Sequence, residues 1–356
     1  MFGLTLSALG YTLRAARDFV ATKYVDEEEN MRAVAFTQTG DPEVLRVMDV
    51  PDPVAGPGQV RIRVAVSGVN FRDVGVRRHG RNEGSRVPEP VVTGIEAAGV
   101  VESLGAGVTH LKVGQRVATI CQGGGYGDLL VVSAAQVVPL PDSISDEVAG
   151  TFPMTGFTAW HLVHTAAKVQ PGDTIVVHAA AGGVGIMLVQ LAKRCGATVF
   201  ATVGSDDKID TAKRFGADHV INYQRENFAD AVRALTGGRG VDVVIDGVGA
   251  ATCADDVKAL HPFGRLVSFG RASGAPQLRP DDLQPKSLQW TNFGIFTAYQ
   301  QPEVWNRGVA SLVPLIASGA VDPYITETYP WERAPEAHRR LEGRQTQGKL
   351  ALLHTS

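Results

Sequence analysis

The chain has 356 residues, enough for two domains, with an apolar share of 44% that suits a globular protein. Its 34 lysine and arginine residues against 37 aspartate and glutamate residues give a net charge of −3, so there is no general basic field for nucleic acid. Three dispersed cysteines, Cys121, Cys195 and Cys253, exclude a four-cysteine zinc lobe and argue against a disulfide framework. A reducing compartment follows, most simply the cytoplasm.

Residues 1–30 differ in pattern from the rest of the chain. Apolar side chains recur there at alternating spacings of four and three, which predicts one face of a helix: Phe2, Leu6, Leu9, Leu13, Ala16 and Val20. The favoured interpretation is an extra helix packed on its own domain or on a partner subunit. A helix lying on a membrane surface is the alternative.

From residue 31 to residue 151 the pattern is rich in β-strand signals. Short apolar runs alternate with Gly, Pro and Asp turns, which predicts a barrel-like domain with strands in 32–40, 59–69, 97–105 and 115–121. Residues 293–356 are irregular again and end in a strand-like run, 348–354, so we expect them to complete the same domain.

Between these two parts, residues 152–292 alternate strand and helix patterns with short loops. The predicted strands are 173–180, 198–204, 219–223, 241–248 and 265–270, and the predicted helices are 182–196, 206–216, 227–237 and 252–264. This alternation is typical of a doubly wound parallel sheet with helices on both faces. The sequence therefore predicts an α/β domain inserted into a β-rich one.

The segment "HAAAGGVG" (178–185) joins a buried strand to a helix. Gly182 and Gly185 match the second and third glycines of the dinucleotide fingerprint, and Ala180 stands in the first place. The second glycine leaves room for the pyrophosphate and the third allows close packing of helix and strand, whereas the first only makes a tight turn. Backbone N–H groups at the helix start, around Gly183 and Val184, would face the phosphates. The context predicts a dinucleotide site.

The end of the next predicted strand indicates which dinucleotide binds. NAD sites place an acid there to hold the ribose hydroxyls. Here Gly204 and Ser205 end the strand and Lys208 follows, which suits a 2′-phosphate. Asp206 and Asp207 are the objection, because either could hold the ribose if the strand is longer. We expect NADPH.

Nine segments carry a family resemblance from Met31 to the end of the chain. They are "GVNFRDV", "GIEAAGVVESLGAGV", "GGGYGDLLVV", "FPMTGFTAWHLV", "VQPGDTIVVHAAAGGVG", "FGADHVINY", "VDVVIDGVG", "GRLVSFGRASG" and "GRQTQGKLAL". Together they resemble the medium-chain dehydrogenase/reductase superfamily, in its zinc-free quinone-oxidoreductase and enoyl-reductase branch.

The resemblance implies a GroES-like β-rich catalytic domain and a Rossmann domain, with the cofactor in the cleft between them. The expected division is an N-terminal helical extension (1–30), a first catalytic part (31–151), a Rossmann NADP-binding domain (152–292) and a second catalytic part (293–356). Family members are commonly dimers, so we expect a homodimer whose subunits meet at the sheet edge near 265–270 and 293–300.

The same resemblance assigns cofactor contacts beyond the glycine loop. Lys208 and Tyr223 match positions that look towards the 2′-phosphate, and the rest of the cofactor is lined by positions matching Thr155, Val248, Phe269, Gly270 and Lys349. Zinc-dependent relatives have a cysteine at the position where this chain has Asn70-Phe71, and a His-Glu pair where it has Ile95-Glu96. These soft ligands are missing, so no metal is expected, and Glu96 is expected to be a strand-end or buried hydrogen-bonding acid.

Without a Lewis acid, a conjugated acceptor is the accessible substrate, because hydride can add to it while charge spreads to an oxygen. The expected substrates are quinones, enones and acyl thioesters. Asn70 is the predicted polar group near the nicotinamide or the substrate oxygen, with Asp73 orienting its loop. Tyr126 is either a donor or part of a structural turn, and the proton comes from solvent or His79.

The basic residues of 72–86 allow two interpretations. The five arginines, Arg72, Arg77, Arg78, Arg81 and Arg86, form either a solvated loop or a cationic lip that receives an anionic substrate such as a coenzyme A thioester. A rival to enzymatic function is a non-catalytic relative that keeps the cofactor site for docking or sensing.

Overall fold

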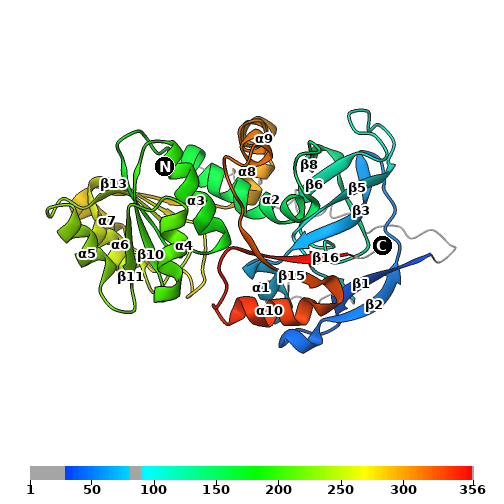
Figure 1. Cartoon of the computed structure of the whole chain (residues 1–356), viewed down its shortest axis with the longest axis horizontal. Helices are drawn as coiled ribbons and strands as arrows, with labels where there is room; N and C mark the ends of the chain where they lie inside the picture. The colour runs from blue at the N-terminus through cyan, green and yellow to red at the C-terminus, as the bar shows by residue number, and fades with distance from the viewer. Residues whose placement is uncertain (1–28, 81–89, 355–356) are drawn as a thin grey trace, which may run out of the picture.

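The structure is a computed structural model that describes residues 29–80 and 90–354. The predicted N-terminal helix lies outside the described residues, as do Arg81 and Arg86. Asn30, expected in the N-terminal extension, already belongs to the first strand. No helix within these two ranges is long and apolar enough to cross a membrane. The chain forms two domains side by side, joined by the long helix α2 (Asp146–His161; Figure 1).

One domain is built on a parallel sheet of six strands in the order β11-β10-β9-β12-β13-β14. Its strands are β9 (Thr174–Val177), β10 (Thr198–Val203), β11 (His219–Asn222), β12 (Val241–Asp246), β13 (Leu260–Ser268) and β14 (Gln289–Asn292). Its helices are α3 (Gly183–Arg194), α4 (Ile209–Arg214), α5 (Phe228–Leu235), α6 (Cys253–Ala259) and α7 (Pro280–Leu283). The central strands are almost wholly buried, which is why they read as continuous apolar runs.

The other domain is β-rich. Its larger sheet has the strand order β15-β16-β3-β5-β6-β8, with β7 paired to β3, and its smaller sheet has the order β2-β1-β4. The strands are β1 (Asn30–Phe36), β2 (Arg46–Pro51), β3 (Gln59–Gly68), β4 (Val91–Val92), β5 (Glu96–Leu104), β6 (Arg116–Ile120), β7 (Leu129–Ser133), β8 (Val137–Pro139), β15 (Ile325–Pro330) and β16 (Lys349–Leu353). Because β16 pairs antiparallel with β3, the two sequence pieces complete one domain, and the predicted α/β fold class is confirmed.

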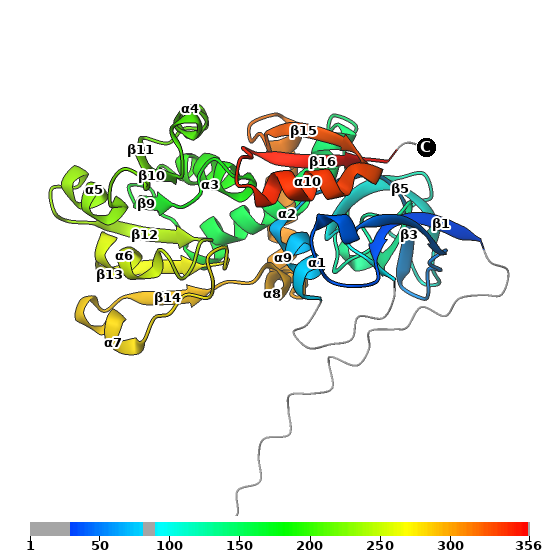
Figure 2. The ribbon, with the colours of Figure 1, turned by 90° about the horizontal axis from the view of Figure 1, so that it is seen from below.

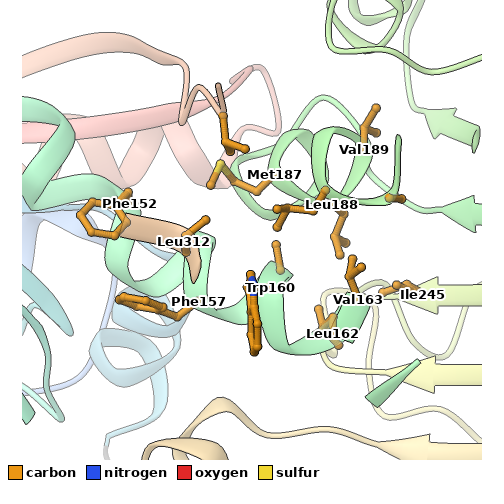
Figure 3. Packing of buried hydrophobic residues seen from close by; sticks show 14 of the residues in the cluster. Phe152, Phe157, Trp160, Leu162, Val163, Met187, Leu188, Val189, Ile245 and Leu312 are labelled. Atoms are coloured by element: carbon orange, nitrogen blue, oxygen red, sulfur yellow. The ribbon is translucent and has the colours of Figure 1, made fainter. Parts of the chain in front are cut away.

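Helix α2 (Asp146–His161) and the π-helical turn after it (Leu162–Ala166) connect the two domains. The Ser145 hydroxyl caps its start by accepting from the Val148 amide at 3.4 Å. Every residue from Ala149 to His161 is buried. Figure 3 shows α2 side chains meeting those of α3 and α9 (Pro302–Ala317) in one continuous core: Phe152, Phe157, Trp160, Met187, Leu188 and Leu312. The expected boundary between residues 151 and 152 thus falls inside a helix.

Two predicted elements have different bounds. The helix predicted for 252–264 ends at Ala259, and residues from Leu260 on belong to β13, because His261 precedes Pro262 and is disfavoured in helical conformation. The sheet edge is formed by β14, one strand beyond β13 (Figure 2). The segment 293–300 follows β14 directly: the Phe293 amide still donates to the Ser268 carbonyl of β13 at 2.7 Å, and the short helix α8 (Ile295–Tyr299) comes next.

Candidate active site and cofactor crevice

The glycine loop lies between β9 and α3, with Gly182 as the residue before the first helical turn. Its tight turn is made by Ala179, which adopts a left-handed φ of 50°, and not by Ala180. A Cβ at Gly185 would overlap the Ala179 carbonyl and the Ala180 backbone, so helix and strand approach each other as the fingerprint requires. The alanine in the first glycine position is therefore compatible with the loop, because no left-handed conformation is needed there.

The loops after β12 and β13 form a second wall of the expected cofactor crevice. The Asp246 carboxylate accepts from the backbone amides of Val248 (2.6 Å) and Gly249 (3.0 Å), which fixes the first loop. A Cβ at Gly270 would overlap the Gly247 carbonyl, so glycine allows the second loop to lie against the first. Val248, Phe269 and Gly270, predicted from the resemblance, are thereby brought together at the carboxyl ends of the strands, where open α/β sheets bind ligands.

A buried network beneath this wall was missed by sequence reasoning. His178 Nδ1 lies 2.8 Å from the Thr202 hydroxyl and His178 Nε2 lies 2.7 Å from Asp256 Oδ1, with Asp246 close by. Burial raises the pKa of Asp256 to about 6. Burial alone would lower the pKa of His178, but the neighbouring Asp256 carboxylate outweighs this effect and raises it. Among the described residues this is the one group of three potential metal ligands. Its hydrogen bonds identify it as a support for the crevice wall, and its residues lie far apart in sequence, so no local pattern could reveal it.

A pocket of about 370 Å³ opens at the end of β10. It is lined by Gly204, Ser205, Asp207, Lys208, Tyr223, Gln224, Arg344 and Gln345. Gly204 lies directly against the Tyr223 hydroxyl, which a Cβ at this position would displace. The Lys208 ammonium donates to the Arg344 carbonyl at 2.6 Å, and burial lowers its pKa.

The two aspartates of this segment separate. Asp206 is turned to Asn222, whose amide donates to it at 2.7 Å, and to Arg225, so it does not line the pocket. Asp207 does line it and accepts from Gln347 at 3.2 Å. Arg344 adds a second cation that sequence reasoning overlooked, although it lies in the quoted segment "GRQTQGKLAL".

On the β-rich domain's side of the expected crevice, Asn70 precedes helix α1 (Phe71–His79) and is 9% exposed. Its Nδ2 donates to Glu96 Oε1 at 2.8 Å, and its Oδ1 accepts from Lys349 Nζ at 2.9 Å. Thr155 of α2 and Lys349 both lie against the first residue of α3, where a Cβ on Gly183 would meet them at 3.1 and 2.8 Å. The structure thus joins Asn70, Thr155 and Lys349 to the glycine loop.

Asp73 and Tyr126 are enclosed behind Asn70. Asp73 Oδ2 accepts from the Asn70 backbone amide at 2.9 Å and from the Tyr126 hydroxyl at 3.3 Å. The same hydroxyl lies 3.2 Å from His338 of α10 (Ala334–Glu342). Burial raises the pKa of Asp73 to about 7 and that of Tyr126 well above its usual value. Both side chains are fully buried, which favours the orienting role for Asp73 and the structural role for Tyr126. His79 lies exposed at the far end of α1.

The residues near Asn70 do not fit a zinc ion. Zinc in proteins is held by Cys, His and carboxylate ligands, whereas Asn70 and Lys349 offer an amide and an ammonium. Both oxygens of Glu96 are engaged, Oε1 by Lys349 and Asn70 and Oε2 by the Met154 amide at 2.8 Å. Glu96 is therefore the buried hydrogen-bonding acid that the sequence indicates.

The arginines of the suggested cationic lip that lie in the described residues, Arg72, Arg77 and Arg78, do not form a free cationic surface. Arg77 is completely buried and donates to both oxygens of Glu342, at 2.9 and 2.7 Å. Arg78 pairs with the same carboxylate, and Arg72 lies over the Phe296 ring. Residues 71–79 form helix α1 and not a solvated loop, and Asp73 caps the first turn by accepting from the Asn70 backbone amide.

Two family models match the chain. The model for the alcohol dehydrogenase GroES-like domain matches residues 56–142, and that for zinc-binding dehydrogenases matches residues 183–313. A 2-haloacrylate reductase from Burkholderia sp. is 37% identical over 329 residues, covering 90% of this chain and 98% of that protein.

Solved structures agree with this relationship. A mycobacterial protein in complex with NADPH superimposes with a TM-score of 0.85 at 37% identity, covering 91% of this chain and all of that one. The Escherichia coli quinone oxidoreductase in complex with NADPH gives a TM-score of 0.84 at 32% identity, with the same coverage. The chain therefore belongs to the medium-chain dehydrogenase/reductase superfamily, among the quinone oxidoreductases and related reductases.

Proposed function

We propose that the protein is an NADPH-dependent, zinc-independent reductase of quinones or of activated double bonds, including enones and enoyl thioesters. The observation that carries the proposal is the pocket with Lys208 and Arg344 at the end of β10, together with the contacts through which Lys349 joins the glycine loop to Asn70. Two cations and a hydroxyl at the end of β10 suit a 2′-phosphate. The relatives named as quinone oxidoreductases and a 2-haloacrylate reductase support the same class of substrate.

Each part of the crevice then has a task. Bound NADPH supplies the hydride from its nicotinamide C4. The α3 backbone amides around Gly183 and Val184 hold the pyrophosphate, and Lys208 with Arg344 holds the 2′-phosphate. Asn70 donates from Nδ2 to the substrate oxygen on which charge collects, which lowers the barrier to hydride addition. Asp73 keeps Asn70 in place by capping the same helix turn.

The test is NADPH oxidation by the purified full-length chain with a panel of quinones, enones and enoyl thioesters, repeated with NADH. We expect turnover with at least one acceptor class and a clear preference for NADPH. Tight NADPH binding without turnover across the panel would instead favour the non-catalytic alternative.

We also propose that the protein is a cytoplasmic homodimer. Its three cysteines are all unpaired, as in a reducing compartment. The edge strand β14 is short and exposes Gln289, Thr291 and Asn292. An open edge of this kind has free backbone groups that a second copy can pair with.

A further inference from the structure

A buried lysine connects the glycine loop to Asn70. Lys349 opens β16, is 3% exposed, and runs past the first residue of α3. Its ammonium has three N–H groups and three acceptors: the Val69 carbonyl at 2.9 Å, Asn70 Oδ1 at 2.9 Å and Glu96 Oε1 at 2.7 Å. All its donors are therefore used inside the protein, so the charged end serves Asn70 and only the aliphatic stem is left to face a cofactor.

The two charges beside Asn70 decide which way its amide points. An ammonium can only donate, so Lys349 must face Oδ1, and a carboxylate can only accept, so Glu96 must face Nδ2. The flipped amide would set donor against donor and acceptor against acceptor in a buried site, where unmatched polar groups are costly. Glu96 does not move with the amide, because the Met154 backbone amide holds its second oxygen.

This arrangement leaves one donor available. The first Nδ2 hydrogen is held by Glu96 at 2.8 Å, in a charge-assisted bond. The second reaches only the Gly68 carbonyl at 3.3 Å, which is longer than a usual N–H···O bond. A substrate oxygen can take this second N–H at little cost.

We propose that Lys349 is a positioning residue, which together with Glu96 fixes the Asn70 amide so that its second N–H is offered to the substrate oxygen. The inference rests on the proposed function, since it concerns the residue that meets the substrate. Because the lysine stem also lies against Gly183, the same side chain sets Asn70 at a defined place relative to the cofactor loop.

A double-mutant cycle between Lys349→Met and Asn70→Ala tests the proposal. We expect Lys349→Met to lower kcat with the best quinone about 100-fold, as for a misplaced catalytic group, with little change in the Kd for NADPH. In the Asn70→Ala background the same substitution should have almost no further effect, because the lysine acts through the asparagine. Lys193→Met is the matched control, since it removes a half-buried lysine that pairs with Asp218 at 2.8 Å, on the C-terminal end of α3 and away from Asn70.

A second variant covers the case in which Lys349→Met does not fold because Glu96 is left unpaired. The double variant Glu96→Gln/Lys349→Met removes both charges, and a folded protein with low kcat supports the proposal. The proposal is overturned if that folded variant keeps the wild-type kcat, if the effects in the cycle add, or if Lys349→Met weakens NADPH binding without changing kcat. If the wild-type chain fails to oxidise NADPH with every acceptor of the panel, the proposed function is overturned and this inference with it. An active wild type with an equally active Lys349→Met variant overturns the inference alone.

Discussion

Lys208 and Arg344 are the two cations of the pocket at the end of β10, and they lie 136 residues apart in the sequence. Replacing Lys208 with alanine should raise the Kd for NADPH about 10- to 100-fold, since a hydrogen bond to a charged group contributes about 1.5–3 kcal/mol. Binding of NADH should change little. Titration of both dinucleotides measures this, with Lys213→Ala on the exposed side of α4 as the control. An equal loss for NADPH and NADH would show that Lys208 does not face the 2′-phosphate.

Asp73 makes stability depend on pH. Because burial raises the pKa of its carboxyl to about 7, the folded protein holds a proton there that the unfolded chain releases near pH 4. The contribution of the Asp73 carboxyl to the stability of the folded protein is therefore full below about pH 4 and is lost as the pH rises to about 7. Asp73→Asn cannot ionise and keeps an oxygen that can accept from the Asn70 amide, so it should lose this dependence.

Melting temperatures at pH 5 and pH 7.5 provide the measurement. The advantage of wild type over Asp73→Asn should shrink or reverse at the higher pH, whereas Asp210→Asn, an exposed site on α4, should show no such trend. A difference between wild type and Asp73→Asn that is the same at both pH values would contradict the assignment.

At the scale of elements, the strand–loop–helix unit around the glycine loop is sensitive to a single added methyl group. Gly185→Ala would press a Cβ against the Ala179 carbonyl and should cost about 1–3 kcal/mol of unfolding free energy, as overpacking does. Ala180→Gly restores the glycine of the usual fingerprint and should leave NADPH binding unchanged, since the turn is made at Ala179. Urea unfolding and NADPH titration of both variants check this, and equal stabilities would refute the packing argument.

The alternation of strands and helices between 173 and 270 was predictable because each buried strand is a continuous apolar run next to an amphipathic helix. The bounds of α6 were not, since Pro262 changes the backbone at a point where the apolar pattern continues. The loop glycines and Ser205 carry local signals. The Lys349–Glu96–Asn70 contacts do not, because Glu96 and Lys349 are 253 residues apart and meet only through the sheet.

At the scale of the whole molecule, the edge strand β14 allows a direct test of the homodimer. Gln289 and Thr291 point to the same side of the strand, because side chains alternate along it. Replacing both with lysine would bring like charges together across a two-fold axis and should convert a dimer into a monomer. Light scattering after gel filtration measures the mass of wild type and variant.

Glu226→Lys, on the exposed surface after the opposite edge strand β11, changes the net charge by the same amount and is the matched control. The predicted interface is refuted if the wild type is monomeric, or if the two-lysine variant keeps the mass of the wild type.

Helix α2 enters both domains and is buried along nearly its whole length. A straight helix transmits length changes as rotation: each inserted residue would turn everything beyond it by about 100° and shift it by about 1.5 Å. One inserted residue would therefore carry the glycine loop away from Asn70 and turn buried side chains of α2 out of the shared core. Over residues 146–161 the chain can exchange side chains of similar volume, but its length is fixed by the need to hold the glycine loop and Asn70 at one relative position.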